Sequence, residues 1–381
     1  MAGLGLLPAE LLSLIGENLN DDDDFLALRL VSRRFNILFR ERHWNSLYER
    51  RRVHITITSL ENLIKISRHP GANYRVQHLL ISDRLPYPVN ASLYKQKDGN
   101  FAWIKECKDN DDDIVRVFKS LNIEREDLAK SGELMALFAM AFTNLPNIHS
   151  IKIEETPLPL TRKDYNLFYP SLGFSPGRRL PVELTRLNGS SYQPSFFGSP
   201  ITPWKSILSA IFVAKLSKIQ IIDSGNSADS GVPIRWFNGS NQRYATFGSL
   251  FRDLTTLRLL LDNEGSNAST KGLCRWITSS GVSLKSLALG CRNSFSNEPR
   301  YFRTLTIGDC KLPKLERFVL WRCRLSCGDV QLCVESCQGT LKSMRFIGCH
   351  WDGEDGPRDQ GGRNKFIKEI QNAYPHIDVG S

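Results

Sequence analysis

The chain of 381 residues is 41% hydrophobic and 24% charged, which is typical of a folded protein and excludes a disordered or fibrous one. Its formal net charge is +10, yet residues 1–52 hold eight basic and eight acidic side chains, so the whole excess lies in the remainder. Because no block of five like charges and no nucleic-acid-binding motif accompanies this excess, we interpret it as solvated lysine and arginine and expect no nucleic acid partner.

Hydropathy and cysteine usage both argue against a secreted or membrane protein. The longest apolar run, residues 134–142, has about half the length that crosses a bilayer, and Glu10 interrupts the first leucines, unlike a secretory signal. Eight of the nine cysteines lie between Cys274 and Cys349, without the dense, even spacing of a disulfide framework. We therefore expect reduced thiols, no membrane contact, and a protein of the cytoplasm, the nucleus or both.

The first 52 residues predict three short amphipathic helices. An apolar stripe with helical spacing starts beside Pro8, a residue that suits a first helical turn. Four consecutive aspartates, residues 21–24, end that helix, and further helices are predicted over residues 25–35 and 40–52. The members of the stripe are Leu7, Leu11, Leu12, Ile15 and Leu19. So small a unit cannot enclose all of its apolar side chains, so some of them must face a partner or the rest of the chain.

The order of residues in this unit resembles an F-box. The resemblance covers residues 4–48 and rests on Leu7-Pro8 followed by Glu10-Leu11, on the run Leu30-Val31-Ser32-Arg33-Arg34-Phe35, and on the late Trp44. Periodicity alone would favour an ordinary N-terminal helical hairpin packed on its own core. The resemblance instead implies docking onto the Skp adaptor of cullin–RING ubiquitin ligases. The adaptor-binding residues that it implies are Leu7, Pro8, Leu11, Leu12, Ile15, Leu19, Leu30, Val31, Phe35 and Trp44.

Residues 53–154 predict the start of an irregular α/β domain. Residues 53–57 alternate apolar and polar types, as a half-buried strand does. A helix is expected over residues 114–121. A second helix, residues 134–142, is apolar almost all round and runs into a tight turn and a strand over residues 148–153.

Two stretches interrupt this pattern. Residues 155–205 contain eight prolines with several glycines and serines, which predicts an insertion that is either a flexible loop or a binding surface. Residues 223–241 predict a second, shorter polar insertion.

Over residues 206–351 a helix followed by an L-x-x-L-x-L strand recurs. The strand patterns at Leu254, Leu284, Leu315 and Leu341 start 30, 31 and 26 residues apart, which is typical of leucine-rich repeats. Each such unit adds one strand to a parallel sheet and returns by a helix, because a single unit cannot bury its own apolar face. Residues 352–381 predict a tail and a C-terminal cap. The expected fold class is α/β: a three-helix F-box, then an irregular leucine-rich-repeat solenoid with a parallel sheet.

The exposed strand positions of these repeats predict a surface for a protein target. Strand side chains that do not enter the core line the concave face of a solenoid. In the later repeats several of these positions are basic and only one, Glu316, is acidic, so we expect a mildly positive face suited to an acidic or phosphorylated segment. The candidate target-binding residues are Arg258, Lys285, Arg317, Lys342 and Arg345. The insertion at residues 155–205 is the alternative receptor site.

Motifs for catalysis are missing from the sequence, so we expect no enzymatic activity and no cofactor. A zinc site is the main alternative for the late cysteines, but the paired C-x2-C spacing of such sites is absent and core packing accounts for the thiols, so no metal is expected. The residues considered are Cys310, Cys323, Cys327, Cys333, Cys337, Cys349 and His350.

The predicted function is therefore that of the target-binding subunit of an SCF-type ubiquitin ligase, a complex of Skp adaptor, cullin and F-box protein. One alternative is an F-box scaffold that acts outside any ligase. The other is a repeat protein that binds an acidic ligand or nucleic acid and uses its N-terminal helices as a cap. The long chain with its insertions also looks similar to the F-box proteins of filamentous fungi.

Overall fold

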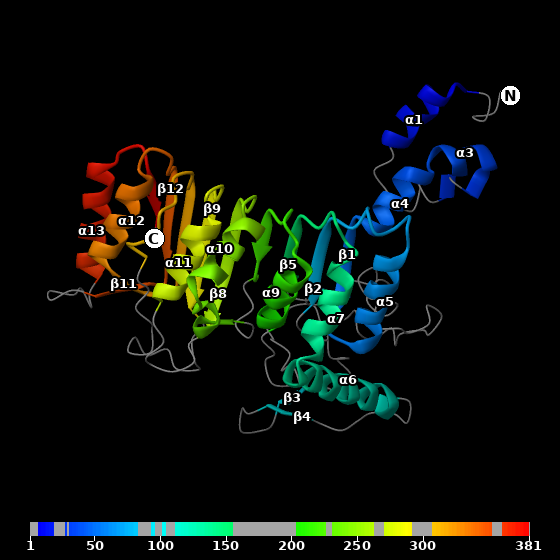
Figure 1. Ribbon diagram of the computed structural model, residues 1–381, viewed down its shortest axis with the longest axis horizontal. Helices are drawn as coiled ribbons and strands as arrows, with labels where there is room; N and C mark the ends of the chain where they lie inside the picture. The colour runs from blue at the N-terminus through cyan, green and yellow to red at the C-terminus, as the bar shows by residue number, and fades with distance from the viewer. Residues whose placement is uncertain are drawn as a thin grey trace.

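A computed structural model shows a mixed α/β protein built on one open, parallel sheet (Figure 1). The residues that it describes are 7–18, 27–28, 30–82, 93–95, 101–103, 111–154, 203–225, 231–262, 270–291, 307–352 and 360–380. The predicted insertion at residues 155–205 lies outside this range up to residue 202, as does Leu19. No helix among the described residues combines the length and the apolar character needed to cross a bilayer.

Ten strands of the described chain form the main sheet, in the order β1-β2-β5-β6-β8-β9-β10-β12-β14 with β7 beside β8. All neighbouring strands run parallel, which confirms the expected parallel sheet. Spatial order follows chain order, so each strand lies next to strands that are close to it in sequence. The bounds are β1 (Arg50–His54), β2 (His78–Ser82), β5 (Ser150–Glu154), β6 (Ile221–Asp223), β7 (Val232–Pro233), β8 (Thr256–Asp262), β9 (Ser286–Cys291), β10 (Arg317–Trp321), β12 (Ser343–Ile347) and β14 (Asp378–Gly380).

Alternation along each strand gives the sheet two different faces. In β10, Phe318 and Leu320 are buried, whereas Arg317, Val319 and Trp321 point the other way. Because the parallel register aligns buried positions with buried ones and outward positions with outward ones, the same alternation continues on the neighbouring strands. We call the side that carries Arg317, Val319, Trp321 and their register partners the open face.

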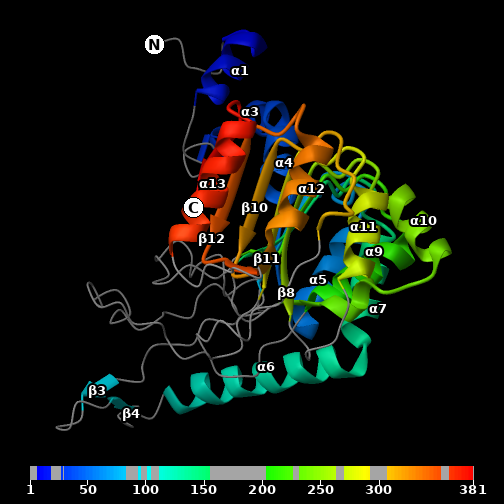
Figure 2. The ribbon, with the colours of Figure 1, turned by 90° about the vertical axis from the view of Figure 1, so that its left-hand side faces the viewer.

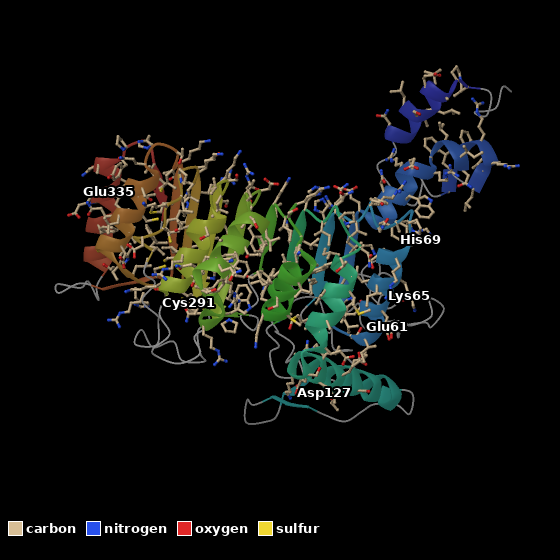
Figure 3. The ribbon with its side chains drawn as sticks, in the orientation of Figure 1. Glu61, Lys65, His69, Asp127, Cys291 and Glu335 are labelled. Atoms are coloured by element: carbon tan, nitrogen blue, oxygen red, sulfur yellow. The ribbon has the colours of Figure 1, made fainter. Side chains whose placement is uncertain are left out.

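Helices cover the opposite face and bury one continuous apolar core against it. Figure 2 shows α5, α7, α9, α10 and α11 on the same side of the strands. The bounds are α5 (Ile57–Arg68), α7 (Glu133–Phe142), α9 (Pro203–Ala214), α10 (Asn241–Leu250), α11 (Lys271–Ser280), α12 (Cys327–Cys337) and α13 (Gln360–Ala373). In α5, Leu60 and Leu63 are buried, while Glu61 and Lys65, labelled in Figure 3, are exposed, as is His69 directly after the helix.

Smaller elements flank the sheet. The helix α6 (Asp111–Ser131) is longer than the predicted 114–121 and lies beneath the sheet in Figure 1. Its Glu124 accepts a hydrogen bond of 2.5 Å from the backbone N–H of Ile57, one of the first donors of α5, which explains how the two helices are joined. Two further strand pairs are β3 (Leu93–Lys95) with β4 (Phe101–Trp103), and β11 (Arg324–Ser326) with β13 (His350–Asp352).

The N-terminal module consists of α1 (Ala9–Glu17), α3 (Arg33–Leu38) and α4 (Arg40–Tyr48), and it extends beyond the β1 end of the sheet in Figure 1. The prediction of one unbroken helix over residues 25–35 is wrong. Ser32 is extended, with φ of −154°, and its Oγ accepts a hydrogen bond of 3.2 Å from the N–H of Phe35, so α3 starts at Arg33.

Glu49 alone separates α4 from β1. Its N–H donates to the carbonyl of Asn45 in α4 (2.8 Å), and its carbonyl accepts from Gln77 (3.0 Å) and His78 (2.9 Å) beside β2. The strand therefore begins three residues before residue 53, where the sequence placed the domain boundary. Both sides of the junction are fixed by backbone hydrogen bonds.

The predicted polar insertion at residues 223–241 is wrong for its second half. Residues 232–237 form β7 and the 3-10 helix η3 (Ile234–Phe237), in which Trp236 and Phe237 are buried. The sequence did not indicate these elements, because glycine, serine and asparagine flank them on both sides and an apolar run of six residues is too short to show a helical or strand period.

Candidate functional site

The N-terminal module has a small core of its own. Leu12, Phe35 and Phe39 are buried there, and the rings of the two phenylalanines are 6.3 Å apart. Arg34 donates a hydrogen bond of 2.8 Å from Nη2 to the carbonyl of Leu7, which ties the start of α1 to α3. Three buried side chains enclose little apolar surface, so most of the other hydrophobic residues that the structure describes in this module remain at its periphery.

Several large apolar side chains of this module face solvent. Leu30 is 88% exposed and Val31 is 69% exposed. A hollow of about 490 Å³ lies along α1, lined by Leu7, Leu11, Leu14, Ile15 and Asn18. The exposed set comprises Leu11, Leu14, Leu30, Val31, Ile37 and Leu47. Several large exposed apolar side chains on so small a module favour a protein-binding site there.

The predicted adaptor-binding residues that the structure describes divide into surface residues, core residues and Trp44, which lies apart from both. Surface positions are occupied by Leu7, Pro8, Leu11, Ile15, Leu30 and Val31. Leu12 and Phe35 point into the small core, so in this conformation they support the surface and do not form it. Pro8 immediately precedes α1, and its carbonyl accepts the N–H of Leu12 at 3.1 Å, so it starts the helix as the sequence suggested.

Trp44 lies where the module meets the sheet domain. Its ring centroid is 5.4 Å from that of Tyr48 and 5.6 Å from that of His69, and the guanidinium of Arg75 lies 5.7 Å from it. Arg75 also forms an ion pair with Glu41 of α4. Trp44 thus fastens α4 to the turn after α5, and it is not grouped with the apolar surface of α1.

The five predicted target-binding residues fall on the open face and on the sheet edge where the strands begin. Arg258, Arg317 and Arg345 belong to β8, β10 and β12. Lys285 and Lys342 immediately precede β9 and β12, and the backbone of Glu316 lies between them, with N–H to carbonyl distances of 2.8 Å on both sides. The register therefore places Lys285 and Lys342 at one level, Arg317 one residue further along, and Arg258 and Arg345 two residues beyond Arg317.

Three carboxylates neutralise part of this charge, and the sequence reasoning had placed only Glu316 there. Asp223 lies 3.8 Å from Nε of Arg258, Glu316 lies 2.7 Å from Nζ of Lys342, and Asp378 lies 2.6 Å from Nη2 of Arg345. The hydrogen bond from Lys342 lowers the pKa of Glu316 from its ordinary value. Five bases and three acids leave a net charge of two among these eight groups, so the face is a mosaic of ion pairs.

An aromatic side chain on the open face also escaped the sequence reasoning. Trp321 of β10 lies over Gly290 of β9, and Arg258 stacks on its ring at 5.4 Å from the centroid. The available signal was Gly290 itself, because a glycine inside a strand often marks a close approach of another group.

The late cysteines lie in the core. Cys291 and Cys323 are buried with their sulfur atoms 3.5 Å apart. The hydrogen bond between these thiols and the burial of Cys323 raise its pKa well above the ordinary value, so it is held as a thiol. Across the part of the chain that the structure describes, no three histidine, cysteine or acidic side chains converge as metal ligands would.

The described residues thus offer two surfaces suited to macromolecular contact, one apolar on the N-terminal module and one of mixed charge on the open face. No model of a protein family matches the chain, and no curated protein matches it in sequence.

Proposed function

We propose that this protein is the target-binding subunit of an SCF-type ubiquitin ligase. In this proposal the module of α1, α3 and α4 is an F-box that binds the Skp adaptor and, through it, a cullin. The observation that carries the proposal is the exposed apolar surface at Leu30, Val31 and the hollow along α1, on the segment whose sequence resembles an F-box. Such a complex belongs to the cytoplasm, the nucleus or both.

The sheet domain is proposed to be an irregular leucine-rich-repeat solenoid that holds the target. Supporting this, the strands lie side by side in chain order, and the helices α5, α7, α9, α10 and α11 cover the same face of the sheet. Stacked repeats have this arrangement because each unit contacts only its neighbours. The open face, with its mosaic of ion pairs around Trp321, is the proposed contact for the target.

The mechanism is proximity, and the chain itself makes or breaks no bond. One end holds the ligase core while the other holds the target, which raises the effective concentration of target lysines near a ubiquitin-charged conjugating enzyme. The fixed junction at Glu49 and Trp44 suits this role, because a floppy joint would lower that concentration.

Affinity purification with the proteasome blocked tests the proposal. The full-length chain should retain both the adaptor and a cullin, and Val31→Asp should abolish their recovery by placing a charge in the apolar contact. Val282→Asp is the matched control, because Val282 is also exposed but lies in the turn after α11, far along the sheet. Equal recovery with both variants would contradict the proposal. Recovery of adaptor without cullin would instead favour a scaffold acting outside a ligase.

A further inference from the structure

The helix layer has a gap between α9 and α10. The helices α7 and α9 pack on each other, as do α10 and α11, but β7 and η3 enter the layer between α9 and α10. A hollow of about 390 Å³ opens there on the helical side of the molecule (Figure 1 shows both helices in green and yellow-green). We call this hollow the outer groove; it is lined by Ser209, Phe212, Val213, Trp236, Ser240, Gln242, Arg243, Thr246 and Phe247.

The outer groove has a rigid aromatic floor and an apolar rim. The ring centroid of Phe247 lies 5.4 Å from that of Phe212 and 5.4 Å from that of Trp236. Trp236 is further fixed by a hydrogen bond of 3.4 Å from its Nε1 to the hydroxyl of Ser209. On the rim, Val213 is 58% exposed and Phe212 is 36% exposed, so apolar surface remains uncovered among the described residues.

A guanidinium stands at one side of the groove. Arg243 lies 4.9 Å from the ring centroid of Trp236 and 5.3 Å from that of Phe247, and its Nη1 donates to the carbonyl of Asn238 at 3.1 Å. No carboxylate of the described residues forms an ion pair with Arg243. These contacts hold the guanidinium in place and leave it available to an anionic group.

The segments that build the groove contain basic but no acidic residues. Residues 203–222 and 231–251, which build α9, η3 and α10, contain five basic residues and no acidic one. The basic residues are Lys205, Lys215, Lys218, Arg235 and Arg243. An occupant that carries carboxylates would therefore complement this region, whereas a basic occupant would be repelled.

We propose that the outer groove binds a short amphipathic helix of a partner protein, with leucine or aromatic anchors on the floor and an acidic residue facing Arg243. A hollow of this size accommodates a few large side chains. Apolar anchors at helical spacing in a groove between two helices are a common mode of peptide recognition. This site lies on the opposite side of the sheet from the open face, so it is separate from the proposed target and adaptor contacts.

Single-stranded nucleic acid fits the same groove less well. Bases bind by stacking on an exposed aromatic face. Trp236 is only 7% exposed and Arg243 lies over its ring, so the face needed for stacking is already taken. The accessible apolar atoms belong to Val213 and Phe212 on the rim, which suit an aliphatic or aromatic anchor.

A peptide selection tests this proposal on the full-length chain. The probe is a displayed library of peptides of about three helical turns, and the bound peptides are remade with a fluorescent label for anisotropy. Enriched peptides should carry leucine or phenylalanine at helical spacing together with aspartate or glutamate. Val213→Glu should weaken their binding by about tenfold or more, because it places a charge on the apolar rim. Val282→Glu, the same change at a valine that is 54% exposed outside the groove, should leave binding unaltered.

Arg243→Gln separates the charge contact from the apolar one. It should reduce the preference for an acidic peptide over its amide counterpart while both peptides still bind. Equal binding to the Val213→Glu and Val282→Glu variants, or an enriched set without acidic residues, would overturn the proposal. If a labelled oligothymidylate binds the wild-type chain but not the Val213→Glu variant, the ligand of the groove is single-stranded nucleic acid and the helix proposal is wrong. Adaptor recovery is measured separately, so a negative result here leaves the proposed function standing.

Discussion

The indole of Trp321 occupies the space directly over Gly290 on the neighbouring strand, where an added β-carbon would overlap its ring atoms. The same ring supports the guanidinium of Arg258, which lies 3.8 Å from the carboxylate of Asp223. One glycine therefore permits an arrangement that spans β6, β8, β9 and β10. Its consequence is that the charge of Arg258 is held in one orientation on the open face.

Replacing Gly290 by alanine should displace Trp321. Overpacking of this kind costs roughly 1–3 kcal/mol of unfolding free energy, measured by urea denaturation. Gly328→Ala is the matched control, because the nearest atom to an added β-carbon there is Ser326 Oγ at 3.7 Å. Adding Trp321→Ala to Gly290→Ala should recover part of the loss. Equal stability of the two alanine variants would show that the ring moves aside at no cost.

Replacing Leu7 and Pro8 together by alanine should weaken adaptor binding. The change removes an apolar side chain that lines the hollow along α1 and the residue that starts the helix. A loss of roughly 2–4 kcal/mol is expected, which corresponds to about 30- to 1,000-fold in Kd. Calorimetric titration with the adaptor measures it, and far-ultraviolet circular dichroism should show that the sheet domain stays folded. Wild-type affinity in this variant would argue against an F-box.

Charge reversal on the open face should reduce target capture and leave adaptor binding intact. Reversing Lys285, Arg317, Lys342 and Arg345 together alters exposed groups only, but it also sets like charges against Glu316 and Asp378. Lys285→Glu with Arg317→Glu breaks no ion pair among the described residues, although both side chains lie near enough to Glu316 to lower its pKa. Quantitative mass spectrometry of captured proteins measures the effect. If capture persists in this pair but is lost when residues 160–200 are replaced by a neutral linker, the proline-rich segment is the receptor site.

His54 should make the protein sensitive to acid. Burial, with a smaller effect of Arg52, lowers the pKa of His54 from 6.5 to about 3. Between pH 6.5 and about pH 3, His54 is therefore protonated in the unfolded chain but neutral in the folded one. The free energy of unfolding keeps its full value above pH 6.5 and falls as the pH drops toward 3. The full contribution is on the order of 5 kcal/mol.

The variant His54→Leu checks this dependence. The difference between its unfolding free energy and that of the wild type should change with pH only below about pH 6.5. His376→Gln serves as the control, because His376 is exposed in the turn before β14. A pH profile of His54→Leu parallel to that of the wild type would show that His54 does not titrate with unfolding.

The buried cysteines should bind no stoichiometric zinc. The sulfur atoms of Cys291 and Cys323 lie 3.5 Å apart in the core, and the raised pKa of Cys323 opposes the deprotonation that metal binding would require. Native mass spectrometry should give the mass of the chain alone, and a chelator should leave the thermal midpoint unchanged. One zinc per chain with unfolding on chelation would reveal a metal site.

The sequence predicted those parts of the fold in which the same pattern of buried and exposed positions recurs from one strand to the next. Leu257 and Leu259 alternate in β8 as Leu287 and Leu289 do in β9, so the pattern alone indicated both strands and the helices between them. The apolar surface of the N-terminal module was likewise visible in the spacing of its leucines. Each of these inferences needs only contacts between residues that are close along the chain.

What escaped prediction depends on contacts between distant residues. Asp223 meets Arg258 only because β6 and β8 pair in one register, and Trp321 meets Gly290 for the same reason. The outer groove exists because η3 enters the helix layer, although its residues look like part of a polar loop. The break at Ser32 was missed because a serine within an apolar period is compatible with both a helix interior and a cap.

The single residue between α4 and β1 sets a direction as well as a distance. Each residue of an α-helix turns the chain by about 100° and advances it by about 1.5 Å, so the length of α4 decides where its apolar neighbours point relative to the sheet. The backbone of Glu49 is hydrogen-bonded to α4 on one side and to the start of β2 on the other, so this single residue cannot reorient α4 relative to the sheet. A molecule bound to the N-terminal helices is therefore held in one fixed orientation relative to a molecule bound to the sheet. Only the part of the second molecule that faces the first in this orientation can be reached by it.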